Sequence, residues 1–356
     1  MTIKVYVVDD SAVVREAFLH LLSGDPEIEL MGSAPNPLIA APVIRKNRPD
    51  VLLLDIEMPG MDGLTFLRQI MAESPIPTVI CSTLTSQGSK VALEALSAGA
   101  VAVVGKPKLG LKKFLEDSRR ELLQTLKTAA RTRPRTQALA PRSAMPAKAS
   151  NRPTSAAAIA GVHALAMNKP VVIGSSTGGT QAVELILRAL PRDCPGVAVV
   201  QHMPESFMTM YAQRLDAACE VTVKEARDGD RLERGVVLIA PGGRHMQLKK
   251  VGGQYHAVVT DGPPVNRHKP SVDVLFQSVA ECAGKDALGM LLTGMGNDGA
   301  RGMKLMHDRG ARTVAQNEET CVVFGMPMEA IRLGAVDHIL PLLDMSDAIL
   351  DFDRRG

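Results

Sequence analysis

The chain has few aromatic residues and no tryptophan. Its 356 residues include three tyrosines and seven phenylalanines, so the aromatic platforms on which unpaired bases stack are scarce. The five cysteines are odd in number, scattered along the chain and never in a C-x-x-C pair. This pattern argues against a disulfide framework and against a cysteine zinc site, and we expect the thiols to be buried or spare.

Long apolar runs are also missing. No run approaches the roughly 20 residues that cross a bilayer, and the start, MTIKVYVVDD, carries acids where a signal peptide has its apolar stretch. We therefore expect a cytoplasmic protein with no membrane insertion. Hydrophobic residues make up 46% and charged residues 22% of the chain, which is typical of a soluble globular protein. At roughly 150 residues per domain, the length suits two domains.

Acidic residues are absent between Glu121 and Glu184, whereas eight lysines and arginines lie in that interval. Since the net charge of the whole chain is only +3, the remainder is net acidic and lacks the basic excess typical of nucleic-acid binding. Residues 127–164 are rich in Ala, Pro and Arg and show no sustained period. We interpret them as a flexible basic linker between domains at 1–126 and 165–356.

The first domain alternates short apolar segments with stretches of helical periodicity. This alternation predicts a five-stranded parallel sheet wrapped by helices. Ser11 is the expected N-cap of the first helix. The expected strands are Val5–Val8, Ile28–Met31, Val51–Leu54, Thr78–Cys81 and Val101–Val104.

The second domain shows the same alternation and is predicted to be a second doubly wound α/β domain. Gly252 and Gly253 supply the turn of an expected hairpin over His245–Thr260. The other expected strands are Pro170–Ile173, Val197–Gln201, Val221–Lys224, Val236–Ile239, Leu288–Leu292 and Thr313–Ala315. The expected helices are Ala182–Leu190, Glu205–Leu215, Val272–Cys282, Ala300–Arg309 and Met328–Leu333.

Polar side chains follow several strands of the first domain. Asp9 and Asp10 follow the first strand, Asp55 the third, Ser82 the fourth and Lys106 the fifth. Because the carboxyl ends of parallel strands lie at one edge of a sheet, these residues are expected to converge. A divalent cation such as Mg²⁺ would relieve repulsion among the carboxylates. The pattern indicates a phosphoryl-transfer site with a carboxylate nucleophile.

Three polar residues close strands of the second domain in the same way. Ser176 lies in GSSTGG, His202 in QHMP and Asp298 in GMGNDG. Such a set could form an activated serine nucleophile, although spacing alone does not choose Ser176 over Ser175. The order differs from that of the α/β-hydrolases, and GSSTGG is not their G-x-S-x-G turn. Nucleotide binding by this loop is the alternative, but the loop has neither a Walker lysine nor a G-x-G-x-x-G motif.

Two further features belong to this hypothesis. The flanking glycines would let the backbone N–H groups of Thr177 and Met295 approach a developing oxyanion. The polar loop Asp261–Pro270 could contribute a histidine base, or could grip a substrate carboxylate with Arg267. We interpret that loop as a rim of the site.

Residues 3 to about 121 resemble the receiver domain of two-component response regulators, most recognisably in DIEMPGMDG. The resemblance implies that Asp55 accepts a phosphoryl group from a chemotaxis histidine kinase. It also implies that Asp9, Asp10 and Asp55, with the backbone carbonyl of Glu57, hold Mg²⁺.

The same resemblance implies that Ser82 and Lys106 read the phosphorylated state. One position departs from the family pattern. Receivers usually carry an aromatic switch residue on the fifth strand, where this chain has Val103. The usual aromatic rotation is therefore in question, whereas the phosphorylation chemistry is not.

Residues from about 165 onward resemble the catalytic domain of chemotaxis protein-glutamate methylesterases. The motifs are IGSSTGGT, QHMP, IAPGGRHM, DGPPVNRHKPSVDVLF, LLTGMGNDGA and AQNEETCVVFGMP. The resemblance implies a Rossmann-like domain with Ser176, His202 and Asp298 as the triad and Thr177 and Met295 at the oxyanion hole. No cofactor is implied for the esterase reaction.

The implied activity is removal of methyl groups from methylated glutamates on chemoreceptors, the methyl-accepting chemotaxis proteins, with deamidation of glutamines as a second activity. The implied control is covering of the catalytic edge by the unphosphorylated receiver. The rival hypothesis is a receiver fused to a catalytically silent binding module, against which the intact triad argues. The hypothesis that the second domain binds DNA has less support, because no helix-turn-helix pattern appears in the sequence.

Overall fold

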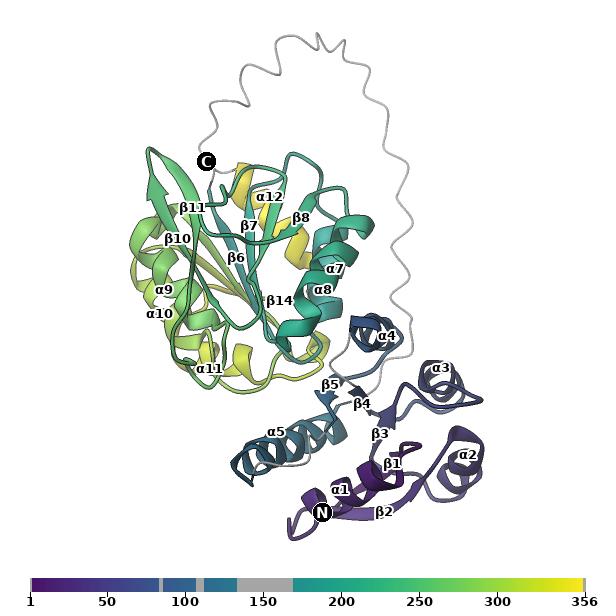
Figure 1. Ribbon diagram of the computed structural model, residues 1–356. Coiled ribbons are helices and arrows are strands. Elements are labelled where there is room, and N and C mark those ends of the chain that lie inside the picture. The colour runs from purple at the N-terminus through teal and green to yellow at the C-terminus, as the bar shows by residue number, and fades with distance from the viewer. Residues whose placement is uncertain (1, 83–85, 107–111, 133–168, 355–356) are drawn as a thin grey trace.

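The computed structural model describes residues 2–82, 86–106, 112–132 and 169–354. Two α/β domains lie one beside the other, each with a parallel sheet between helices (Figure 1). The predicted fold class is thus confirmed. Among the described residues, no helix has the length and apolar character needed to cross a bilayer.

The N-terminal domain has one five-stranded sheet in the order β2-β1-β3-β4-β5, with every neighbouring pair parallel. Its strands are β1 (Ile3–Val8), β2 (Ile28–Ala34), β3 (Val51–Asp55), β4 (Thr78–Ser82) and β5 (Ala102–Gly105). Its helices are α1 (Ala12–Leu22), α2 (Pro37–Lys46), α3 (Gly63–Glu73), α4 (Ser86–Ser97) and α5 (Lys112–Ala130). Ser11 caps α1 by accepting a hydrogen bond from Val14 N, as predicted.

The C-terminal domain has a seven-stranded parallel sheet in the order β14-β13-β12-β6-β7-β9-β8 and a separate antiparallel hairpin, β10-β11. The strands are β6 (Val171–Ser175), β7 (Val197–Gln201), β8 (Thr222–Glu225), β9 (Val236–Ile239), β10 (His245–Val251), β11 (Gln254–Thr260), β12 (Leu288–Leu291), β13 (Arg312–Gln316) and β14 (His338–Leu340). The helices are α7 (Gly179–Arg188), α8 (Glu205–Ala218), α9 (Val272–Cys282), α10 (Ala300–Asp308), α11 (Met326–Arg332) and α12 (Met345–Arg354).

Strand order fixes where a site can form in the C-terminal domain. The central strands β6, β7 and β12 are buried along their whole length, as expected for parallel strands covered on both faces. From β6 the chain moves to β7 on one side and later returns to β12 on the other. Such a reversal opens a crevice at the carboxyl ends of the strands, where ligands bind in open α/β sheets.

The predicted strands all form, several with shifted ends, and two elements near the end of the described chain were not predicted. Strand β14 is a short edge strand and α12 is the last described helix. Helix α5 continues to Ala130, so the first residues of the predicted linker are helical. Residues 133–164 of that predicted linker lie outside the described residues.

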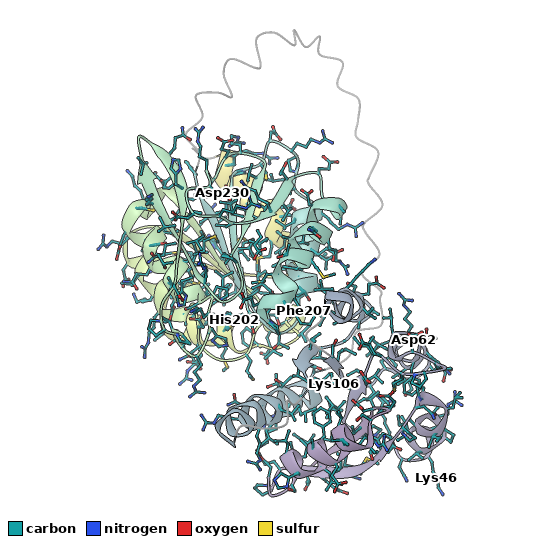
Figure 2. The ribbon with its side chains drawn as sticks, viewed as in Figure 1. Lys46, Asp62, Lys106, His202, Phe207 and Asp230 are labelled. Carbon is teal, nitrogen blue, oxygen red and sulfur yellow. The ribbon has the colours of Figure 1, made fainter. Side chains whose placement is uncertain are left out.

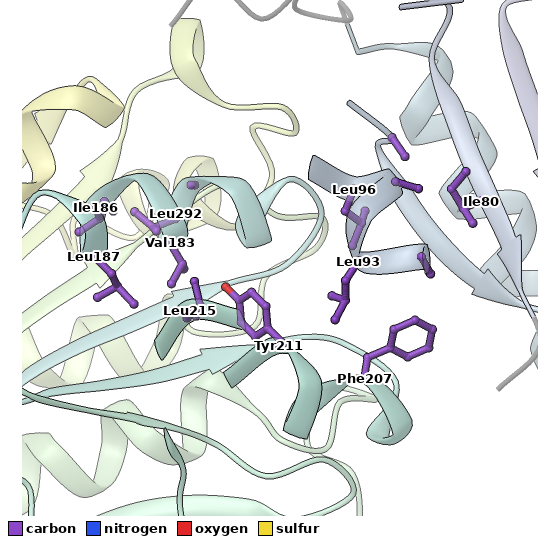
Figure 3. Packing of buried hydrophobic residues seen from close by; sticks show 14 of the residues in the cluster. Ile80, Leu93, Leu96, Val183, Ile186, Leu187, Phe207, Tyr211, Leu215 and Leu292 are labelled. Carbon is purple, nitrogen blue, oxygen red and sulfur yellow. The ribbon is translucent and has the colours of Figure 1, made fainter. Parts of the chain in front are cut away.

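The two domains share an apolar contact. Leu93 and Leu96 of α4 belong to the same buried cluster as Phe207 and Tyr211 of α8 (Figure 3). Polar groups accompany this contact at the end of α4. Arg214 of α8 donates to the carbonyl oxygen of Leu93 at 3.1 Å, and Gln181 of α7 donates to that of Leu96.

These donors lie near the C-terminal end of helix α4, which carries the negative end of the helix dipole. They add to bonds made within the N-terminal domain, because Gly99 N already donates to Leu96 O and Ser97 Oγ to Leu93 O. The positive charge of the Arg214 guanidinium suits that end of the helix. The N-terminal domain therefore contacts the C-terminal domain through the end of α4, a helix that begins shortly after β4.

Candidate active site

Three neighbouring strands present the predicted polar residues of the C-terminal domain. Ser176 follows β6, His202 follows β7 and Asp298 lies in the loop after β12, while β6 pairs with both of the other strands. Backbone bonds hold the strand ends together, because His202 N donates to Ser175 O and Ser176 N to Thr293 O, each at 3.0 Å. Figure 2 shows His202 at the end of the domain that faces the receiver.

His202 and Asp298 form a buried pair. His202 Nε2 lies 2.8 Å from Asp298 Oδ2, and the imidazole side chain is 7% exposed. Because a carboxylate only accepts hydrogen bonds, Nε2 carries the ring proton. His202 Nδ1 is buried and has no hydrogen-bond partner among the described residues. It is therefore the ring atom free to take a proton.

Asp298 remains ionised because donors surround it on every side. Asn266 Nδ2 and Ser271 Oγ donate to Oδ1 at 2.8 and 2.7 Å, and the backbone N–H groups of Val272 and Asp273 donate at 2.7 and 3.3 Å. Burial opposes ionisation, but His202, Asn266 and Ser271 together hold the pKa of Asp298 below its usual range. The two backbone donors open helix α9, whose dipole also favours a negative charge there.

The two serines of the glycine-rich loop differ in environment. Ser175 is fully buried, and its hydroxyl donates to Gln201 Oε1 at 2.7 Å. Ser176 is partly exposed and sits at the open edge. No hydrogen bond joins Ser176 Oγ to His202, although both residues are described. Such bonds are often long or absent in unliganded enzymes and tighten when substrate binds.

The predicted oxyanion residues flank this serine. The backbone N–H groups of Thr177 and Met295 donate to no other group within the described ranges. Glycine lets the two loops approach closely, since a Cβ on Gly294 would lie 2.8 Å from Ser176 Cβ. Met295 also contacts the receiver, because Thr128 Oγ1 at the end of α5 donates to Met295 Sδ at 2.9 Å.

The loop 261–270 contributes more than a rim. Asn266 bonds to Asp298, and the His268 ring stacks on the His202 ring with centroids 3.7 Å apart. Arg267 is exposed. Sequence reasoning missed Asn266 and Ser271 as partners of Asp298. The only signal for Ser271 was its place just before the apolar period of α9, where a capping residue is expected.

Burial and charge act on His268 together. Burial, followed by the nearby His202 and opposed by Asp298, lowers the pKa of His268 from 6.5 to about 4. Arg267, next in the chain, acts in the same direction as burial. His268 is therefore a neutral ring at pH 7.

The acidic residues of the receiver also converge as predicted. Lys106 Nζ lies 2.7 Å from Asp55 Oδ2 and 3.2 Å from Asp9 Oδ2. Asp9 and Asp55 are almost fully buried, while Asp10 is exposed. Burial raises the pKa of Asp55 to about 6, and the Lys106 ammonium limits the rise.

These residues fit a magnesium ion. Ligand oxygens of Asp9, Asp10 and Asp55 lie within 4.8 Å of one another. Asp9 Oδ2 is buried, and the Lys106 ammonium at 3.2 Å is its one partner among the described residues, so it keeps a lone pair for coordination. Carboxylate oxygens are the ligands that Mg²⁺ prefers. Glu57 is exposed, and its backbone N–H donates to Asp55 Oδ1 at 3.2 Å.

The predicted switch residues lie beside this cluster. Ser82 is fully buried at the end of β4, and its carbonyl oxygen accepts a hydrogen bond from Lys106 N at 3.0 Å. Val103, at the usual aromatic position, is partly buried and packs against the large apolar cluster. The valine thus occupies an inward position in this state.

Fold and sites together define a class of protein. It is a receiver with an acidic, lysine-paired pocket, joined to an α/β domain that gathers a hydroxyl, an imidazole and a carboxylate at one sheet edge. Comparison with known families agrees. Residues 5–115 match the response regulator receiver domain and residues 171–349 match the CheB methylesterase family.

Relatives extend the match to nearly the whole chain. The protein-glutamate methylesterase/protein-glutamine glutaminase 1 of Chromobacterium violaceum is 54% identical over 96% of this chain and 97% of its own. The protein-glutamate methylesterase/protein-glutamine glutaminase 2 of Dechloromonas aromatica is 53% identical, over 99% of this chain and 98% of its own. The crystal structure of the Thermotoga maritima CheB methylesterase catalytic domain covers 52% of this chain and 98% of its own, with 39% identity and a TM-score of 0.51. The chain belongs to the family of receiver-linked CheB protein-glutamate methylesterases/protein-glutamine glutaminases.

The lowered pKa of His268 predicts a specific dependence of stability on pH. Below about pH 6.5 the unfolded chain protonates this histidine, whereas the folded protein does so only near pH 4. The free energy of unfolding should therefore fall as the pH drops from 6.5 to 4. His268→Phe should reduce this loss, as measured by melting temperatures across that range. His256→Phe on the remote hairpin is the control, and equal slopes for wild type and His268→Phe would contradict the prediction.

Proposed function

We propose that this enzyme hydrolyses glutamate methyl esters on chemoreceptor cytoplasmic helices, with Ser176 as nucleophile, His202 as base and Asp298 as orienting acid. The observation that carries the proposal is the buried hydrogen bond between His202 and Asp298, made beside the strand end that presents Ser176. A hydroxyl, an imidazole and an orienting carboxylate are the parts of an activated serine nucleophile.

The reaction follows in two balanced steps. Ser176 Oγ attacks the ester carbonyl carbon, and His202 Nδ1 takes the hydroxyl proton. That proton passes to the departing methoxide, so methanol leaves and an acyl-enzyme remains. Water, deprotonated by the same nitrogen, then attacks the acyl carbon. His202 Nδ1 returns that proton to Ser176 Oγ as the acyl bond breaks, which releases the glutamate carboxyl group and restores the Ser176 hydroxyl and the neutral imidazole. A glutamine side chain would react in the same way, with ammonia as the leaving group.

Ser176 is preferred over Ser175 on the basis of exposure. Ser175 is enclosed and its hydroxyl already serves Gln201. The N–H groups of Thr177 and Met295 form the oxyanion hole in this proposal, because they are unpaired within the described residues and flank Ser176. Removing one such donor typically costs about 3 kcal/mol of transition-state stabilisation.

Asp55 is the proposed acceptor of a phosphoryl group, and a chemotaxis histidine kinase is the proposed donor of that group. Asp9, Asp10 and Asp55, with the Glu57 carbonyl oxygen, would hold Mg²⁺, which would neutralise phosphoryl oxygens. Lys106 would lend its positive charge to the phosphorylated Asp55, and the Ser82 hydroxyl would bond to it. Support comes from the buried, closely spaced carboxylates and the Lys106 ion pairs.

We further propose that the unphosphorylated receiver limits access to the catalytic edge. The end of α5 contacts Met295, and Val322 of the catalytic domain packs against the receiver's own apolar cluster. Phosphorylation would act through Ser82 on α4, whose C-terminal end is the part held by Arg214. Weakening that hold would free the edge for receptor helices.

Release of methanol from methylated receptor membranes tests the chemistry. Ser176→Ala should lower the rate about 10³-fold or more, because the nucleophile is lost. Ser175→Ala should keep most of the activity, since it removes a structural hydrogen bond only. Wild-type release should rise with a small phosphodonor and Mg²⁺, and this rise should vanish in Asp55→Asn. Equal release by wild type and Ser176→Ala would refute the proposed nucleophile.

Arg214 and Arg188 form ion pairs with the same glutamate, so substituting each in turn is a matched test of the contact between the domains. Arg214 and Arg188 both pair with Glu184, at 2.8 and 3.5 Å, but only Arg214 also bonds to the receiver. Arg214→Ala should raise the basal rate of methanol release several-fold, because losing this part-buried hydrogen bond weakens the domain contact by about 1 kcal/mol. Arg188→Ala should leave that rate unchanged. Similar rates for both variants would contradict occlusion through α4.

A further inference from the structure

A second histidine covers the face of the first. The rings of His202 and His268 stack with centroids 3.7 Å apart and planes 6° from parallel. His268 Nδ1 is buried without a hydrogen-bond partner in the described part of the chain. The proposed reaction uses no atom of His268, so its place against His202 needs a separate account.

A strained turn puts His268 there. Val265 and His268 exchange both backbone hydrogen bonds, at 3.1 and 2.9 Å. The two residues between them, Asn266 and Arg267, both have positive φ, 50° and 68°. That is the geometry of a type I′ turn, which usually contains glycine. Non-glycine residues keep such a conformation only where surrounding contacts enforce it, and these positions cluster at functional sites.

The enforcing contacts come from the catalytic carboxylate. Asn266 Nδ2 donates to Asp298 Oδ1 at 2.8 Å and to Asp273 Oδ2 at 2.6 Å. The tight turn that holds Asn266 on Asp298 therefore also carries His268 onto His202. One edge of the imidazole is fixed by Asp298 and one face by His268.

Stacking is a better description of this pair than a metal site. Ligand atoms of His202, His268 and Asp298 lie within 4.8 Å of one another. The nitrogen lone pairs of an imidazole lie in the ring plane, however, and the two planes are almost parallel and separated. Lone pairs in separate parallel planes do not converge on one ion. The faces of the rings, by contrast, are in full contact.

We propose that His268 is a positioning residue that holds the His202 ring by stacking, so that Nδ1 stays directed toward the nucleophile throughout the reaction. The inference rests on the proposed triad. The hydrogen bond to Asp298 fixes one ring atom but leaves rotation about that bond unrestrained. An aromatic surface against the ring face removes this freedom. A neutral ring there also favours the imidazolium formed during attack, as aromatic faces attract cations.

Kinetics of methanol release separate this role from a merely structural one. His268→Ala should lower kcat about 10-fold with KM within about twofold, because orientation and not substrate binding is lost. His268→Phe keeps the stacked face and should recover kcat to within about threefold of wild type. Full activity in His268→Ala, or equal losses in both variants, would overturn the proposal, the second by showing that a ring nitrogen is required.

Proton NMR of the His202 ring gives a readout that does not depend on activity. In the full chain carrying Ser176→Ala, the ring protons of His202 should be shifted upfield by the His268 ring. The shift should disappear with His268→Ala and persist with His268→Phe. If the shift is present but wild type releases no methanol, the proposed function fails and the stacking stands. If the shift is absent, the stacking itself is refuted.

Discussion

The buried carboxylate of Asp298 is the interaction on which the catalytic domain depends. It accepts bonds from His202, from two side chains of the 261–271 segment and from the first N–H groups of α9. Burying a charge is costly unless donors replace the lost water. The site therefore exists only when the end of β12, the strained turn and α9 come together.

The contact between the two domains also involves hydrogen bonds near the end of a helix. Arg214 and Gln181 donate to two carbonyl oxygens near the C-terminal end of α4, and Asp298 accepts from the first N–H groups of α9. The contact around Asp298 is internal and buried, and the contact between the domains is only partly buried. Polar contacts of the second kind are individually weak. The proposed control uses this difference, because a change in α4 would act on the weaker contact between the domains and leave the buried site in place.

The sequence predicted the sheets and the strand-end residues because both follow from local rules. Apolar runs mark buried parallel strands, and a polar residue just after each run must lie at the shared edge. Strand β14 was missed because it has only three residues, two of them exposed. Spacing could not separate Ser175 from Ser176, since the choice depends on which hydroxyl is enclosed. The stacked His268 was hidden because its type I′ turn contains no glycine.

Substitution of Asp298 by asparagine tests the central claim most directly. The account predicts that the full chain with Asp298→Asn keeps its fold by circular dichroism but releases methanol from methylated receptors about 10³-fold to 10⁴-fold more slowly, because His202 loses its tautomer and orientation. The loss should persist with phosphodonor and Mg²⁺ present, since releasing the receiver cannot restore the pair. A folded Asp298→Asn variant with near wild-type release would contradict the account.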